Sequence, residues 1–98
     1  MTDRQQMIIE ENIELDLDEL CRSLRCDVEL IVMLVHEGAL EPRGDAPTQW
    51  RFAGTALQRA RRAVRLAHDL EINPPGVALV LQLLDQIRQL EAELGQRR

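Results

Sequence analysis

Residues 16–38, DLDELCRSLRCDVELIVMLVHEG, predict two short helices joined by a very tight turn. Asp16 can cap the first helix, with Glu19 at its third position, which is close to a capping box. Apolar residues then recur at the spacing of an amphipathic helix. We expect this first helix to end near Arg25.

The second helix is expected over residues 28–37, directly after the first. Asp27 is positioned to cap its start. Gly38 stands where a left-handed residue would end it, and Pro42 follows shortly after. A tight pair of helices of this kind is typical of a helix-turn-helix.

The segments on either side of the pair predict short extended structure. Residues 7–15 have few turn formers and a weak alternation, which indicates an edge strand. Residues 42–49 are rich in turn formers and lead into a brief extended segment. In that segment Trp50 and Phe52 share one face and are expected to pin the core, while Arg51 points the other way. Together these features predict a wing.

Two longer helices complete the chain. The third is expected to start at residue 54 or 55 and to stop before residues 73–76, Asn-Pro-Pro-Gly, which also start the fourth helix. The fourth runs to about Leu94. The fold class is therefore mainly α, a winged helix-turn-helix with short N-terminal and wing strands. Residues 1–72 are expected to form this domain and residues 73–98 a dimerisation helix, in a single structural unit.

Composition narrows the function classes. The 98 residues are enough for one domain, and the net charge of −5 argues against a protein that mainly neutralises phosphates. Residues 1–45 hold 12 acidic residues and 4 arginines, a charge of −8, whereas residues 46–98 hold 5 acidic residues and 8 arginines, a charge of +3. No apolar run is long enough to span a bilayer and no leader pattern is visible, so we expect a cytoplasmic protein without a membrane partner.

The sequence predicts no catalytic, metal or cofactor site. Ser23 is the sole serine, lysine is absent, and no glycine-rich phosphate loop is visible. Cys21 and Cys26 are expected to be reduced, and their spacing relative to His36 and His68 does not match a metal site. An enzyme is not expected.

The open face of the second helix argues against DNA recognition. At 100° per residue, its buried side holds Leu30, Ile31, Leu34 and Val35. Its open side holds Glu29, Met33, His36 and Glu37. A recognition helix with two carboxylates and no Arg, Lys, Asn or Gln on this side would be repelled by phosphates and could not make the usual bidentate base contacts.

The last helix carries more apolar surface than one small domain can cover. A coiled-coil-like seam predicts a homodimer; its residues are Val80, Leu83, Leu84, Ile87, Leu90 and Leu94. The only dense basic group lies on the third helix, at Arg59, Arg61, Arg62 and Arg65. These arginines could touch phosphates or pair with carboxylates of the same or the neighbouring subunit.

Several segments resemble the CbpM family of chaperone modulators. They are VHEGALEPR at residues 35–43, WRF at 50–52, RRAVRLAHDLEI at 61–72, PGVAL at 75–79 and LLDQI at 83–87. The resemblance covers roughly residues 12 to 94. It implies a MerR-like winged-helix fold, a homodimer, and binding to the J-domain of the DnaJ homologue CbpA. Such binding blocks the work of CbpA with DnaK and its DNA binding.

The resemblance also suggests where the partner binds. DNA-binding members of the wider MerR family carry an Arg and paired Tyr residues where this chain has residues 32–35, Val-Met-Leu-Val. An acidic head in place of a basic one would suit the Lys- and Arg-rich surface of a J-domain. The candidate partner-binding residues are Glu29, Met33, His36 and Glu37 on the second helix and Asp16, Asp18 and Glu19 at the start of the first. Two alternatives stay open: a MerR-like transcriptional regulator that binds DNA through the wing and the arginines, and a modulator of some other protein.

Overall fold

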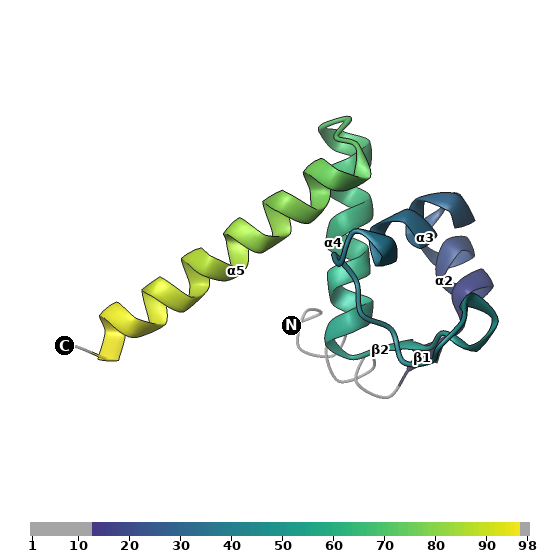
Figure 1. Ribbon diagram of the computed structural model, residues 1–98, viewed down its shortest axis with the longest axis horizontal. Helices are drawn as coiled ribbons and strands as arrows, with labels where there is room; N and C mark the ends of the chain where they lie inside the picture. Colours follow the sequence, from purple (N-terminus) through teal and green to yellow (C-terminus); the bar gives the residue numbers. More distant parts are fainter. Residues whose placement is uncertain (1–12, 97–98) are drawn as a thin grey trace, which may run out of the picture.

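Helices form most of the molecule, with one short sheet at their base (Figure 1). The computed structural model describes residues 13–96. Its elements are β1 (Glu14–Leu15), α2 (Leu17–Leu24), α3 (Val28–His36), the 3-10 turn η1 (Pro47–Gln49), β2 (Phe52–Ala53), α4 (Thr55–Asp69) and α5 (Pro74–Gln96). The first part of the predicted edge strand, residues 7–12, lies outside the described residues. The described elements confirm the winged helix-turn-helix.

Helix α2 begins and ends as its sequence predicts. The backbone N–H of Glu19 donates to Oδ1 of Asp16 at 2.8 Å, and the N–H of Asp16 donates to Oε1 of Glu19 at 2.9 Å, which completes the capping box. Arg25 is left-handed, with a φ of 55°, and ends the helix. Only Cys26 and Asp27 lie between Arg25 and the first residue of α3.

Helix α3 differs from the prediction at its start. Asp27 occupies the N-cap position, but its side chain accepts no capping hydrogen bond; instead its backbone carbonyl accepts from the N–H of Leu30 at 3.1 Å. The other end is as expected. Gly38 has a φ of 79° and donates its N–H to the carbonyl of Val35 at 3.0 Å.

The wing closes the sheet beside the helices. Strand β2 pairs antiparallel with β1, so that Leu15 lies opposite Phe52, and an isolated bridge joins Arg43 to Arg51. Gly44 turns the chain here with a φ of 109°. A Cβ at this position would lie 2.4 Å from the carbonyl oxygen of Gln49, so the turn requires glycine.

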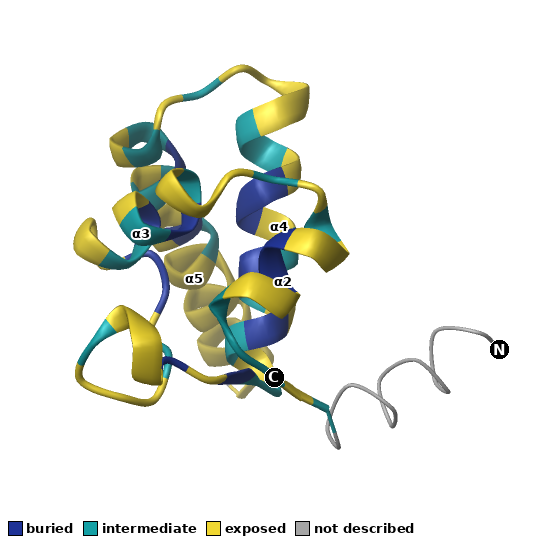
Figure 2. Cartoon of the chain, turned by 90° about the vertical axis from the view of Figure 1, so that its right-hand side faces the viewer, coloured by how far each residue is buried: buried dark blue, intermediate teal, exposed yellow. Residues whose placement is uncertain are grey.

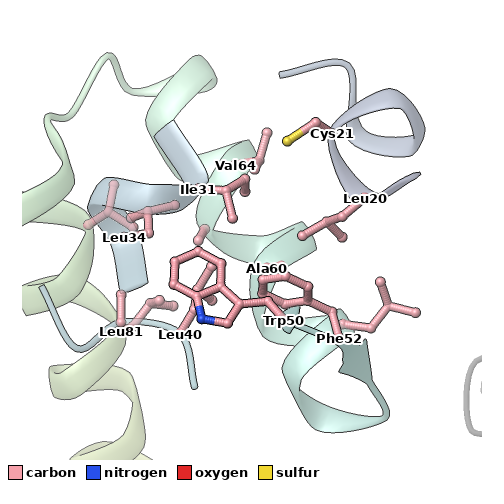
Figure 3. Packing of buried hydrophobic residues seen from close by; sticks show 14 residues of the cluster. Leu20, Cys21, Ile31, Leu34, Leu40, Trp50, Phe52, Ala60, Val64 and Leu81 are labelled. Carbon is pink, nitrogen blue, oxygen red and sulfur yellow. The ribbon is translucent and has the colours of Figure 1, made fainter. Parts of the chain in front are cut away.

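The core lies between the helices and the base of the wing (Figure 3). Trp50 and Phe52 are both buried and meet edge to face, with ring centroids 6.3 Å apart. This contact confirms that the wing aromatics pin the core. The largest fully buried side chains are Phe52, Leu20, Ile31, Leu34, Leu40, Leu57, Leu81 and Val77.

The last two helices form a corner, from which α5 runs away from the body of the molecule (Figure 1). Asn73 caps α5 through Oδ1, which accepts from the N–H of Gly76 at 2.9 Å. Val77 and Leu81 bury the first half of α5 against α3 and α4. Leu70 is exposed because α4 ends at Asp69 and the chain reverses there.

Candidate protein-interaction surfaces

Helix α3 presents an open face to solvent, although its other side is buried against α2, α4 and α5. The four residues predicted for this face are all exposed; they are Glu29, Met33, His36 and Glu37. Met33 exposes 48% of its surface, which is high for a large apolar residue on a helix that packs against three others. The predicted open face of the helix is thus confirmed as accessible surface.

The open face is also more apolar than the sequence indicated. Val28 is 43% exposed and Val32 is half-buried. With Ile31 and Leu34 at the centre of the buried side, helical geometry puts both valines on the far edge of the face that holds Glu29. The exposure of these valines could not be predicted from the sequence, because a valine in an apolar run is typical of a core residue. Carboxylates beside exposed apolar groups suit a protein partner better than a phosphate backbone.

The three acidic residues at the start of α2 do not form one group. Asp16 and Glu19 use their carboxylates in the capping box. Asp18 is exposed and lines an open hollow at the α2–α3 turn together with Val28. The structure therefore brings Asp18, but not the two capping residues, to a surface shared with α3.

The hollow at the α2–α3 turn has a volume of about 520 Å³ and mixed charge. Two carboxylates, two guanidinium groups, two thiols and one valine side chain line it; they belong to Asp18, Cys21, Arg22, Arg25, Cys26, Asp27 and Val28. Burial raises the pKa of the Cys21 thiol. Burial, reinforced by the Cys21 thiol and the carboxylate of Asp27, raises the pKa of Cys26 to about 12. Both cysteines are free thiols.

A stripe of apolar side chains follows the outward side of α5. We call it the α5 stripe; its exposed members are Leu79, Leu83, Ile87, Leu90 and Leu94, each between 48% and 60% exposed. In Figure 2 the far part of the α5 ribbon carries the colour of exposed residues. The sequence predicted four of these residues and missed Leu79, because apolar residues surround the start of the helix and hide which side is buried.

Two residues of the predicted seam lie differently. Val80 is half-buried at the edge of the α5 stripe. Leu84 is half-buried on the inner side of α5, where it lines a hollow between α4 and α5 together with Arg62 and Arg88. Leu84 is therefore placed toward α4 rather than in the α5 stripe.

Arg59 links three parts of the fold. Its Nε donates to the carbonyl oxygen of Ala39, just after α3, at 2.6 Å. Its guanidinium forms two contacts with the carboxylate of Asp85 on α5, at 3.0 and 3.1 Å. The hydrogen bond from Arg59 lowers the pKa of Asp85 below its ordinary value. This member of the basic group thus has a structural role.

The wing arginines are also engaged within the chain. Arg43 forms an ion pair with Glu14 of β1. Arg51 is exposed, as predicted, and its Nη1 donates to the carbonyl oxygen of Trp50 at 2.8 Å. Both arginines thus use their guanidinium groups for contacts within the chain, and neither contact indicates a phosphate-binding site.

Chemistry-bearing clusters are sparse in the part of the chain that the structure describes. Among residues 13–96, no group of three or more His, Cys, Asp or Glu side chains is arranged to hold a metal ion. None of the helices described there combines the length and the apolar character needed to cross a membrane.

Comparisons with known proteins relate the chain to one family. The family model described as "MerR HTH family regulatory protein" matches residues 15–98. A chaperone modulatory protein CbpM from Coxiella burnetii (strain Dugway 5J108-111) is 42% identical over 88 residues, which is 90% of this chain and 83% of the relative. CbpM proteins from Pseudomonas putida (strain W619) and Pseudomonas entomophila (strain L48) are 38% and 36% identical over 81 residues, which is 83% of this chain and 80% of each relative. All three relatives are named as modulators of chaperones.

Proposed function

The chain belongs to the CbpM family of chaperone modulatory proteins, within the MerR helix-turn-helix family, and on this basis we propose that it binds the J-domain of a DnaJ-class co-chaperone. Bound there, it keeps the co-chaperone from working with DnaK and from binding DNA. The open face of α3 is the contact surface. The observation that carries this proposal is that an acidic and apolar face occupies the position where a DNA-binding relative would read bases.

Charge supports a basic partner for this face. Glu29 lies near the middle of the open side of α3 and Glu37 follows the last residue of the helix, and this side holds no lysine or arginine. The family resemblance supplies a J-domain surface rich in Lys and Arg as the complement. Complementary charge of this kind speeds association and favours the right partner, and its effect weakens as salt rises.

The apolar members of the face supply the part of the binding energy that salt does not screen. Met33, Val28 and Val32 expose apolar surface that a protein partner would remove from water. Methionine adapts its shape to a partner because its side chain is unbranched and flexible. The apolar side chains therefore lie beside Glu29 and His36, so that a partner would meet charge and apolar surface together.

Inhibition by such contact is steric. The surface that DnaK would use on the J-domain is covered by α3, so one site cannot hold both proteins. Asp18 extends the acidic rim through the hollow it shares with Val28. Asp16 and Glu19 lie at the margin, since their carboxylates already accept backbone hydrogen bonds.

A homodimer is the second part of the proposal. The α5 stripe leaves five large apolar side chains exposed in the single chain, at a spacing near that of a coiled-coil seam. Pairing of two stripes would bury them and leave both α3 faces open, because Val77 and Leu81 hold the other side of α5 against the body of the chain. The assembled modulator would then present two equivalent partner sites.

The experiment that tests the proposal is calorimetric titration of the full chain with the isolated J-domain of the cognate co-chaperone, at low and at high salt. We expect saturable binding that weakens with salt. The double variant Glu29→Lys with Glu37→Lys should weaken binding at least about tenfold, because two attractive contacts become repulsive. The matched control is Glu91→Lys with Glu93→Lys, which makes the same change of charge on the far part of α5.

The outcomes separate the alternatives. Equal loss of binding in both double variants would mean that net charge, rather than the face of α3, governs the interaction. Absence of binding by the unaltered chain would overturn the J-domain proposal. Titration with duplex DNA would then test the regulator alternative, in which Arg62 and Arg65 should matter and Glu29 should not.

A further inference from the structure

The end of α2 brings two cysteines together. Arg25 adopts the left-handed conformation, and the N–H groups of Arg25 and Cys26 both point to the carbonyl oxygen of Cys21, the latter at 3.1 Å. The left-handed Arg25 and the bond from Cys26 to Cys21 are features of a Schellman motif, in which Leu24 is the cap, Cys21 stands three positions before it and Cys26 lies just beyond the left-handed residue. Side chains at these two positions frequently touch, which predicts contact between the thiols.

Two further observations support that contact. The Cys26 side chain is near enough to Cys21 for that thiol to help raise the pKa of Cys26, and both side chains line the open hollow at the α2–α3 turn. Cys21 is buried and Cys26 is half-buried, so a small reagent meets Cys26 first. The chain has no other cysteine. A disulfide requires a short Cβ separation, which contact between these two side chains would supply.

We propose that Cys21 and Cys26 form a dithiol modification site at which a low-molecular-weight disulfide, such as oxidised glutathione, closes an intramolecular disulfide. The thiolate of Cys26 attacks one sulfur of oxidised glutathione and releases one glutathione thiolate. The thiolate of Cys21 then attacks the sulfur of Cys26 and releases the second. The two cysteines lose two electrons to the reagent, and their two protons end on the two released glutathione molecules.

The closed disulfide would tie the end of α2 to the residue next to the start of α3. It would therefore fix the turn that sets the direction of α3. The proposal of a dithiol site rests on the geometry of this turn and is independent of the partner that α3 binds.

The shifted pKa values set the speed of the reaction. A thiol with a pKa of about 12 has very little thiolate near neutral pH, so exchange at Cys26 is slow and accelerates about tenfold for each unit of pH. Once a mixed disulfide forms at Cys26, contact with Cys21 makes ring closure faster than a second attack from solution.

The test is a time course of the full chain with oxidised glutathione, in which samples are quenched with acid, unfolded, treated with N-ethylmaleimide and weighed by intact mass spectrometry. We expect a species that carries no maleimide and no glutathione and has lost about 2 Da, the mass of two hydrogens. Cys21→Ala and Cys26→Ala should each stop at a mixed disulfide. The oxidised chain should also unfold at a higher temperature, and dithiothreitol should reverse that shift.

Three results would overturn the proposal. A mixed glutathione disulfide that accumulates on the unaltered chain would show that the thiols do not meet. Disulfide-linked dimers would show that the reaction is intermolecular. Two thiols that remain open to maleimide, over a period in which the chain unfolded in guanidinium chloride becomes fully oxidised, would show that the fold prevents closure. If Cys21→Ala does not fold, the unaltered chain and Cys26→Ala still distinguish these results.

Discussion

Replacing Arg59 by methionine should destabilise the fold by about 2 to 3 kcal/mol, although the residue is partly exposed. The variant keeps the approximate length of the side chain but loses the hydrogen bond to the carbonyl oxygen of Ala39. Ala39 is a buried residue, with 2% of its surface exposed. Loss of a bond from a charged donor to a buried acceptor costs about 1.5 to 3 kcal/mol. The ion pair with Asp85 adds only about 0.2 to 1 kcal/mol, because the Asp85 side chain is half-exposed to solvent.

The assay is urea unfolding followed by circular dichroism, at one fixed protein concentration because self-association would otherwise shift the midpoint. The matched control is Arg62→Met, one turn further along α4, where an exposed arginine is replaced by the same residue. We expect its free energy of unfolding to lie within about 0.5 kcal/mol of the unaltered chain. Equal free energies for Arg59→Met and Arg62→Met would refute the structural role given to Arg59.

The same variant has a pH signature. Arg59 holds the pKa of Asp85 below its ordinary value of 3.8, so the ion pair contributes stability above that pH and loses it as pH falls through the lowered value. In Arg59→Met the pKa of Asp85 returns toward 3.8, and this part of the acid sensitivity disappears. The difference in stability between variant and unaltered chain should therefore narrow below about pH 4, and a difference that widens there would contradict the assignment.

Three further predictions concern the α5 stripe, the wing and the thiols. Leu83→Asp with Ile87→Asp should raise the dissociation constant of a homodimer at least about a hundredfold by sedimentation, because each side chain is worth about 1.5 to 3 kcal/mol when buried; unchanged sedimentation would remove the stripe from any interface. Gly44→Ala should lower the midpoint of thermal unfolding, since its Cβ meets the carbonyl oxygen of Gln49 and its φ is positive, and an unchanged midpoint would contradict the wing geometry. Iodoacetamide should alkylate Cys26 at about pH 8 at least about a hundredfold more slowly in the folded chain than in the chain unfolded by guanidinium chloride, and equal rates would contradict its raised pKa.

The parts of the fold that the sequence predicted are those governed by neighbours along the chain. The capping box at Asp16 and the left-handed Gly38 each follow from a few adjacent residues, and both are confirmed. The hydrogen bond from Arg59 to Ala39 and the ion pair of Arg59 with Asp85 join residues 20 and 26 positions apart. No local sequence pattern could therefore predict them.

The candidate site was predicted in outline for a related reason. Periodicity shows that a helix has two sides, but tertiary packing decides where the buried side is centred. On α3 that centre left Val28 and Val32 at the edge of the open face. On α5 it turned Leu84 inward and Leu79 outward. An apolar residue beside the boundary therefore cannot be assigned to core or surface before the packing is known.

The buried side and the exposed stripe of α5 belong to one continuous helix, so the direction of one fixes the direction of the other. One residue inserted after Asp85 would leave the core contacts and the pair with Arg59 in place but rotate the rest of the helix by about 100° and advance it by about 1.5 Å. The stripe would then face a different direction with its composition unchanged. Seven inserted residues would rotate it by only about 20°. A member of this family can therefore lengthen α5 by sevens without changing which way its second half faces, but not by ones.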